Sequence, residues 1–324
     1  MNSRRSFIEK VSKGAALSTI AMAAPSGLLA NTITMAKEKT KIIGIIGAEN
    51  SHAAGFGRMF NVDKKFSGFE VRYIWGETDE FAKTASQKGS IPNIVKDPEE
   101  MMGNIDALIV DHRHAKYHLQ AATPFVKAGI PTFVDKPFCY RKQEGQEFLR
   151  LARETGTPVT SFSSIAHSYK TFDIREQVQE MGDIKQVVSY GPVDIKSEYG
   201  GIFFYGVHTV QPLLYIFGDT VEKVRVNENG ENSTATLVFA NGLNATLIFI
   251  NKIRGWETYA ETEKGIVKLE ARNKVEGPDK NYVDMVEMFR TGKEPRSHES
   301  ILHCVAVLEA LERSVASEQW EKVL

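Results

Sequence analysis

The feature that most constrains the fold is an apolar segment that runs directly into a glycine turn. Residues 41–47 read KIIGIIG, which is typical of a parallel strand that is covered on both faces. A helix is predicted over residues 53–60, shortly after the turn. Strand, tight glycine turn and helix form the opening unit of a dinucleotide-binding fold, in which a helix N-terminus faces the pyrophosphate. The sequence therefore predicts an α/β domain with a Rossmann-type sheet.

The glycine pattern of this opening unit is altered. Gly47 occupies the tight-turn position, but Glu49 replaces the second glycine of the usual fingerprint and His52 replaces the third. A carboxylate at that place repels a pyrophosphate unless it turns away or a neighbour offsets its charge. Asn50, Ser51 and His52 can instead supply side-chain donors or a helix N-cap. A Rossmann-shaped domain that has lost its dinucleotide is the alternative.

The chain then alternates strands and helices, as βαβ units require. Further strands are predicted at 69–75, 105–110, 132–134 and 158–162, and helices at 99–102, 119–128 and 141–155. Glu77 follows the second strand, where an acid would bind the adenosine ribose hydroxyls. Its charge favours NAD over NADP, because a carboxylate repels a 2′-phosphate.

Polar residues also follow the strand that ends at residue 110. Asp111 and His112 are predicted to line the cofactor cleft. A metal site that combines Asp111 with His114 and His118 is an alternative. Nothing nearby in the sequence completes such a ligand set, so no metal is assigned.

The strand at 132–134 ends in Asp135, Lys136 and Pro137. Lys136 would lie just beyond the carboxyl end of the strand, where ligands bind in open parallel sheets. Pro137 restricts Lys136 to an extended conformation and so directs its amine. For an isolated motif, a lysine on a solvated loop is the better interpretation, but the neighbouring motifs favour a functional role.

These motifs together resemble the glucose-fructose oxidoreductase / inositol dehydrogenase / MocA family. The matching stretches are IIGIIG at 42–47, EEMM at 99–102 before IDA at 105–107, and AGI at 128–130 before VDKP at 134–137. The family has Glu-Lys-Pro where this chain has Asp135, Lys136 and Pro137, and its lysine contacts the substrate beside the nicotinamide. The resemblance implies an NAD or NADP cofactor, a catalytic Lys136 and a cofactor-contacting Asp135.

The second half, residues 161–324, is predicted to be an α+β domain. Helices are predicted at 166–181, 209–217, 282–289 and 301–317, and strands at 185–190, 221–227, 233–239, 245–249 and 265–269. Asn241 and Gly242 form a strong hairpin signal between two of these strands. The resemblance implies a large, mostly antiparallel sheet that serves as a substrate wall and as the face of a homo-oligomer.

The family also has two glycines, then an acid, and a histidine four residues after the acid. Here Gly200 and Gly201 are present and His208 matches the histidine, but Phe204 replaces the acid. Residues four apart on a helix face the same way, so the pair would meet one substrate. The resemblance implies that His208 is the general acid/base. Tyr199 and Tyr205 could contact the substrate in place of the acid; a buried structural histidine is the alternative for His208.

The first 35 residues are predicted to be a twin-arginine export signal. Arg4 and Arg5 precede Phe7, and a mildly apolar run at 14–24 is too short and too interrupted to span a membrane. An ordinary basic leader is the alternative. The prediction places the protein in the periplasm, either free or held at the membrane by an uncleaved signal. Residues 38–160 are then the dinucleotide-binding domain.

Length and composition agree with two domains. A chain of 324 residues can bury a sizeable core, and a net charge of −1 gives no reason to expect a nucleic-acid partner. Cys139 and Cys304 match no metal-binding spacing, and whether they pair is open.

The sequence thus predicts an exported NAD(P)-dependent oxidoreductase that acts on a carbohydrate or glycoside hydroxyl, with a small molecule or an oligosaccharide as substrate. His208 and Lys136 would handle the hydroxyl proton. A redox-assisted glycoside lyase or hydrolase is a related possibility. The alternative from another class is a non-catalytic sugar-binding protein on a degenerate dehydrogenase fold, which Glu49 and Phe204 favour.

Overall fold

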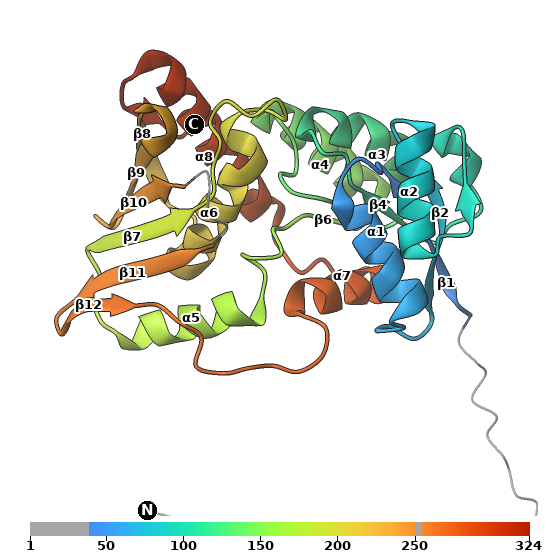
Figure 1. Ribbon diagram of the computed structural model, residues 1–324, viewed down its shortest axis with the longest axis horizontal. Coiled ribbons are helices and arrows are strands. Elements are labelled where there is room, and N and C mark those ends of the chain that lie inside the picture. Colours follow the sequence, from blue (N-terminus) through green and yellow to red (C-terminus); the bar gives the residue numbers. More distant parts are fainter. Residues whose placement is uncertain (1–38, 251–254) are drawn as a thin grey trace, which may run out of the picture. The chain divides into compact units, whose positions relative to one another are not determined.

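The computed structural model describes residues 39–250 and 255–324, so the predicted export signal lies outside the described residues. The first half of the described chain forms a six-stranded parallel sheet of order β3-β2-β1-β4-β5-β6 (Figure 1). Its strands are β1 (Lys41–Ile46), β2 (Phe69–Trp75), β3 (Asn93–Ile94), β4 (Ala107–Val110), β5 (Thr132–Val134) and β6 (Val159–Thr160). This is the predicted Rossmann-type topology.

Helices connect these strands. They are α1 (Ser51–Gly57) with the π-helical turn η2 (Arg58–Val62), α2 (Asp79–Gly89), η3 (Pro98–Met101), η4 (Ala115–Tyr117), α3 (His118–Lys127) and α4 (Lys142–Thr155). The sequence analysis did not predict α2, although Thr78 caps it by accepting a hydrogen bond from the backbone N–H of Phe81. Polar residues dominate α2, so its apolar stripe is weak.

The second half is built on a seven-stranded sheet of order β12-β11-β7-β10-β9-β8-β13, in which only the β7–β10 pair is parallel among the described strands. The strands are β7 (Gln186–Gly191), β8 (Val221–Asn227), β9 (Thr234–Phe239), β10 (Asn244–Phe249), β11 (Glu257–Thr262), β12 (Gly265–Lys268) and β13 (Glu321–Lys322). The predicted mostly antiparallel sheet is confirmed. The hairpin signal at Asn241 and Gly242 is also correct, since β9 and β10 pair across it and Gly242 has a φ of 87°.

The remaining helices are α5 (Tyr169–Glu180), α6 (Ile202–Phe217), α7 (Lys280–Thr291) and α8 (His298–Ser317), with a short 3₁₀ turn, η5 (Gly230–Asn232). The prediction that this part of the chain becomes helical at residue 209 is wrong. The helix begins at Ile202, directly after Gly201, whose φ is 56°. Phe204 and His208 therefore lie one turn apart on the same helix.

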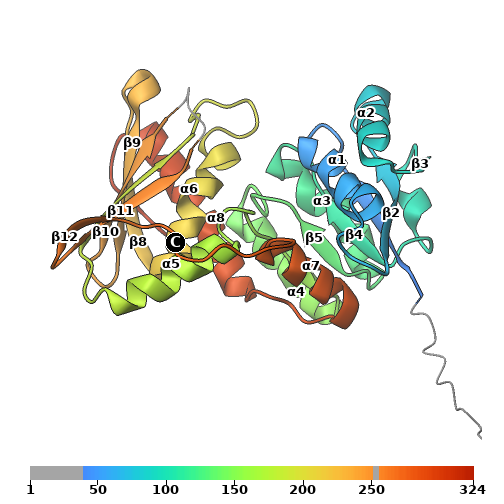
Figure 2. The same ribbon diagram turned by 60° about the horizontal axis from the view of Figure 1, so that its bottom comes forward.

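The C-terminal helices return to the first half of the chain. Helix α7 packs against the Rossmann sheet beside α1, where Met285 and Phe289 share a buried cluster with Phe56 and Phe133 (Figures 1 and 2). Helix α8 contacts α4, where Glu309 accepts a hydrogen bond from the backbone N–H of Lys142 at 2.9 Å. The second half of the chain thus packs against the first through α7 and α8.

The described residues contain neither a disulfide nor a membrane-spanning helix. Cys139 and Cys304 are both buried free thiols. Among the described residues, no helix is both long and apolar enough to cross a bilayer.

Candidate active site

Strand register brings two acids together at the carboxyl edge of the first sheet. Ile46 pairs with Val110, and Val110 pairs with Val134, so the three strands end level with one another. The residues that follow β4 and β5 are Asp111 and Asp135, which are 0 % and 4 % exposed. Their backbone N–H groups donate to neighbouring strands, at 2.7 Å for Asp111 and 2.8 Å for Asp135, which continues the ladder past the strand ends.

Asn50 links the two acids. Its side-chain amide donates to Asp111 Oδ1 at 3.0 Å and to Asp135 Oδ2 at 3.2 Å. Its carbonyl oxygen accepts from the backbone N–H of His52 and so caps α1. The His52 ring nitrogen Nδ1 and the Lys136 amine also lie beside Asp135 Oδ2, at 3.1 Å and 3.3 Å. We call these five residues the strand-end cluster.

The two carboxyl groups of the strand-end cluster have opposite pKa shifts. Burial raises the pKa of Asp111 well above its ordinary value, and the negative charge of Asp135 raises it further. Burial also raises the pKa of Asp135, but Lys136 and His52 lower it by more, so this pKa lies below its usual range. Asp135 therefore carries the negative charge of the pair, with Lys136 as its principal counter-ion.

Lys136 is almost completely enclosed. Its side chain is 7 % exposed, and its amine lies 5.9 Å from the centre of the Phe204 ring. Phe204, at the position where the sequence resemblance implied an acid, thus lies against the lysine amine instead of forming an ion pair with it. The phenyl ring leaves Asp135 as the carboxylate that holds this amine.

His208 lies on α6 and is 7 % exposed. Its Nδ1 lies 2.7 Å from the Ser163 hydroxyl, and Gln211 fixes that residue by accepting its backbone N–H at 2.6 Å. Burial lowers the pKa of His208 well below 6.5, and the charge of Lys136 lowers it further. The imidazole is therefore neutral at pH 7, and Nε2 is available to face a ligand.

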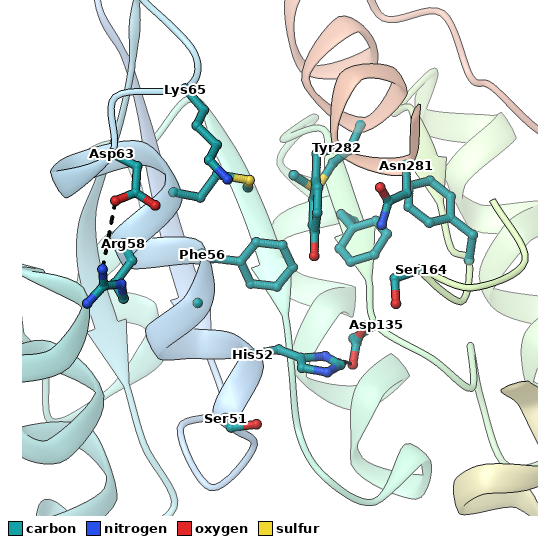
Figure 3. Close-up of a pocket in the computed structure, with 15 residues that line it drawn as sticks. Ser51, His52, Phe56, Arg58, Asp63, Lys65, Asp135, Ser164, Asn281 and Tyr282 are labelled. Atoms are coloured by element: carbon teal, nitrogen blue, oxygen red, sulfur yellow. Dashed lines mark hydrogen bonds and ion pairs between the residues drawn. The ribbon is translucent and has the colours of Figure 1, made fainter. Parts of the chain in front are cut away.

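Two cavities adjoin these groups. One has a volume of about 460 Å³ and is lined by His208 and Trp256. The other, about 270 Å³, lies between α1 and α7 and has His52 and Asp135 at its inner end (Figure 3). Both cavities include Ser164, Asn281 and Tyr282 in their walls. Figure 3 shows the Tyr282 hydroxyl directed toward the His52–Asp135 pair, so this residue lies at the boundary between the two cavities.

The edge of the sheet near β2 has the features of an adenosine site. A Cβ on Gly47, whose φ is 104°, would lie 2.5 Å from the backbone nitrogen of His112, so only glycine fits the turn. Glu77 Oε2 accepts from the backbone N–H groups of Ala48 and Glu49 at 2.8 and 2.9 Å. The other oxygen, Oε1, is buried and has no partner among the described residues, so it is free to accept a ribose hydroxyl.

A hollow of about 390 Å³ adjoins this edge and is lined by Trp75, His112 and Tyr117. The His112 ring centre lies 5.8 Å from each of the other two rings. Burial lowers the pKa of His112 to about 3, so the ring is neutral. A planar, uncharged base suits such a surface, and the chain's own residues therefore fit the adenosine half of a dinucleotide.

Glu49 does not point into open space. The Tyr199 hydroxyl donates to its carboxylate at 2.7 Å, and the hydrogen bond raises the pKa of Tyr199 to about 12. The guanidinium of Arg113 lies 4.1 Å from the centre of the Tyr199 ring. Tyr199 thus joins the two halves of the chain, and its contact with substrate stays a prediction. Tyr205 lines a hollow next to it and has its ring 5.6 Å from that of His208.

The other predicted polar residues have structural roles or peripheral positions. Ser51 is exposed at the start of α1 and lines the outer part of the cavity in Figure 3. His118 is fully buried, with Nε2 2.8 Å from the main-chain oxygen of His112 and Nδ1 2.9 Å from that of Pro137. Both ring nitrogens of His118 are thus engaged, and it does not join Asp111 in a metal set with His114.

Sequence reasoning missed three residues of the candidate site, Ser163, Asn281 and Tyr282, and considered Trp256 only as an aromatic that could stack on a sugar. Ser163 orients His208, while Trp256, Asn281 and Tyr282 form cavity walls. The sequence gives only a weak signal for Tyr282. This residue begins a predicted helix whose apolar side chains indicate a core position and not a site. Their roles arise only when distant segments of the chain meet.

Comparisons with known proteins agree with the Rossmann fold of the first half. Residues 41–162 match the model of the GFO_IDH_MocA family, described as an oxidoreductase family with an NAD-binding Rossmann fold. No match was found among curated proteins.

Solved structures share the fold across both halves. Myo-inositol 2-dehydrogenase from Lactobacillus plantarum has a TM-score of 0.74 at 16% identity, covering 88% of this chain and 100% of that one. GenD2 from gentamicin A biosynthesis, solved in complex with NAD, has a TM-score of 0.74 at 12% identity, covering 94% and 100%. The apo scyllo-inositol dehydrogenase from Lactobacillus casei has a TM-score of 0.72 at 17% identity, covering 89% and 99%.

Proposed function

We propose that this chain, whose first half carries the Rossmann fold of the Gfo/Idh/MocA oxidoreductases, is an NAD(P)-dependent oxidoreductase that acts on the hydroxyl of a sugar or related polyol. The observation that carries the proposal is the neutral, buried His208 at the wall of a 460 Å³ cavity, within electrostatic reach of Lys136. Cavities of this size suit a monosaccharide or glycoside. The inositol dehydrogenases among the similar folds are in keeping with such a substrate.

His208 serves as the base in this proposal. In this role Nδ1 carries the ring proton and donates it to the Ser163 hydroxyl oxygen, which leaves Nε2 to accept the proton of the substrate hydroxyl. The ammonium of Lys136, held by Asp135, stabilises the negative charge that develops on the substrate oxygen. The nicotinamide, when bound, supplies the hydride acceptor. Tyr282 and Trp256 enclose the reacting groups and limit the entry of water.

NAD is the favoured cofactor. Gly47, the free oxygen of Glu77 and the hollow beside His112 would hold its adenosine half. A 2′-phosphate would meet the negative charge of Glu77, which disfavours NADP.

We also propose export and self-association. Export rests on the paired Arg4 and Arg5 in the sequence, which lie outside the described residues. Replacing both by lysine should leave the protein in the cytoplasmic fraction. Association through the second sheet is supported by β9 and β10, where every other residue is only half-buried; a monomer in sedimentation experiments would contradict it.

A second candidate function has specific support. Glu49 is tied to Tyr199 from the other half of the chain, and Phe204 covers Lys136. Both features suit a non-catalytic sugar-binding protein that retains a dehydrogenase fold. A redox-assisted lyase or hydrolase would use the same His208 and the same cofactor as the oxidoreductase.

One experiment separates these candidates. Protein purified from its host is denatured and assayed for released dinucleotide, then tested with NAD⁺ and a panel of polyols and glycosides for a change in nicotinamide absorbance. The oxidoreductase predicts both signals, and it predicts loss of the absorbance change in H208Q but not in H303Q, which changes a half-buried histidine on α8. Sugar binding without dinucleotide, and without any absorbance change, would favour the binding protein.

A further inference from the structure

In the strand-end cluster only Asp135 has a lysine counter-ion, so Asp111 keeps its proton unless a further cation replaces it. Two buried carboxyl groups, Asp111 and Asp135, share one ammonium, and that ammonium belongs to Lys136 and lies beside Asp135 at 3.3 Å. Asp111 Oδ1 receives only the neutral amide of Asn50 at 3.0 Å. Asp111 Oδ2 is fully buried and has no hydrogen-bond partner among the described residues. A carboxyl group so placed is costly unless a further cation or a proton accompanies it.

We propose that Asp111, Asp135 and His52 bind a divalent metal ion, with the side-chain amide of Asn50 as a fourth ligand. One ligand atom from each of the first three residues lies within 4.8 Å of the others. These residues follow β1, β4 and β5, so strand register preforms the site. The site is distinct from the set of Asp111, His114 and His118 considered from the sequence, and it does not depend on the proposed enzymatic function.

The separations within the cluster, which are hydrogen-bond contacts in this structure, bracket the ligand spacing around a tetrahedral ion. A tetrahedral ion with bonds of about 2.1 Å places its ligands about 3.4 Å apart. The observed separations are 3.0 and 3.2 Å from Asn50 Nδ2 to the two carboxylates, and 3.1 and 3.9 Å from His52 Nδ1 to Asp135 and Asp111. Rotation of the Asn50 amide by half a turn would present its oxygen, which is the coordinating atom, in place of its nitrogen.

The mixture of ligands indicates the class of ion. Carboxylate and amide oxygens suit manganese and magnesium, whereas an imidazole nitrogen suits zinc and other transition metals. One nitrogen and three oxygens therefore favour Mn²⁺ or Zn²⁺ over Ca²⁺. The Lys136 ammonium lies beside Asp135 Oδ2, the oxygen that also faces Asn50 and His52, so a bound ion would displace the amine from that oxygen.

An entry route to the site exists. The cavity between α1 and α7 reaches both His52 and Asp135, and the His52 side chain is 40 % exposed (Figure 3). Asp63 and Lys65 line this cavity at a distance from the His52–Asp135 pair in the same view. An ion with bound water can therefore reach the cluster without unfolding either half.

The test is Mn²⁺ binding to the full chain after treatment with a chelator and in the absence of nucleotide. Free Mn²⁺ is measured by electron paramagnetic resonance, and the heat of binding by calorimetry. We expect one ion per chain and at least a tenfold loss of affinity in D111N, which keeps the shape of the side chain, and in H52A. D63N is the matched control, because Asp63 lines the same cavity but lies outside the cluster; its affinity should equal that of the wild type.

Two results would overturn the site. The first is failure of the wild-type protein to bind Mn²⁺ or Zn²⁺ at millimolar concentration, or equal binding by wild type and D111N. The second is an infrared band of a protonated carboxyl group that is absent in D111N and unchanged by Mn²⁺, since a proton would then accompany Asp111 in place of the ion. Circular dichroism of each variant verifies that the fold is retained. None of these readouts depends on catalysis, so the metal site can be tested even if the protein has no enzymatic activity.

Discussion

The strand-end cluster and the His208 cavity both bury ionisable side chains, but in opposite electrical states. The cluster keeps a charged pair, Asp135 and Lys136, inside the protein. The cavity holds a neutral imidazole whose pKa is lowered by burial, with only a hydroxyl as its partner at Nδ1. A neutral base can accept a proton, whereas a paired ammonium can hold a negative oxygen in place. In the proposed function, this difference gives proton transfer to α6 and charge stabilisation to the edge of the sheet.

The largest effect should come from removing the neutral base. H208Q should lower kcat by about 10²- to 10⁴-fold, because glutamine cannot accept the hydroxyl proton. The measurement is the initial rate of nicotinamide reduction with the best substrate of the panel. H303Q, which changes a residue in the wall of neither cavity, should retain the wild-type rate. Equal rates in H208Q and wild type would show that His208 is not the base, and a residue of the strand-end cluster would then be the next candidate.

Removing the buried cation should cost stability. K136M leaves Asp135 without its counter-ion and should lower the free energy of unfolding by about 3–5 kcal/mol, as for other broken buried pairs. Urea denaturation measures the change. K96M provides the contrast, since the Lys96–Asp79 pair is exposed and should contribute less than about 1 kcal/mol. Similar losses in the two variants would show that the cluster is not a charged pair.

Acid should destabilise the protein through its neutral histidines. The pKa of His112 falls from 6.5 to about 3 on folding, so between these values the unfolded chain binds a proton that the folded chain does not. Stability from this group is present above pH 6.5 and is lost as the pH falls, by about 1.4 kcal/mol per pH unit. H112Q should therefore flatten the dependence of unfolding free energy on pH from 6.5 to 4. An unchanged slope would show that other groups control it.

The smallest effect concerns the bridge between the halves. Y199F frees Glu49 from its hydrogen bond, and the released carboxylate can turn toward a bound pyrophosphate. We expect NAD⁺ to bind about two- to tenfold more weakly, since one hydrogen bond contributes about 0.5–1.5 kcal/mol. Y259F removes a similar bond to Glu257 on β11 and serves as the control in a fluorescence titration. Tighter binding by Y199F would mean that Tyr199 obstructs the nucleotide.

Much of the first half was predictable because local patterns determine it. Buried strands and glycine turns predicted the sheet, and parallel strands that end level place Asp111 beside Asp135. The link through Asn50 was not predictable, since it depends on how a capping side chain is oriented. Ser163 and Tyr282 meet their partners only through contacts between remote parts of the chain, and neither carries a local motif. The start of α6 was misplaced because Gly200 and Gly201 gave no clear signal of where the turn ends.

His118 has a consequence beyond its own packing. Its ring lies between the main-chain oxygens of His112 and Pro137, one residue past Asp111 and one past Lys136. The loops after β4 and β5 therefore contact the same rigid imidazole ring, and a movement of one loop requires a movement of the other. A ligand that displaces one of the two acids would also displace the Lys136 amine, so the cluster should respond to ligand binding as a single unit.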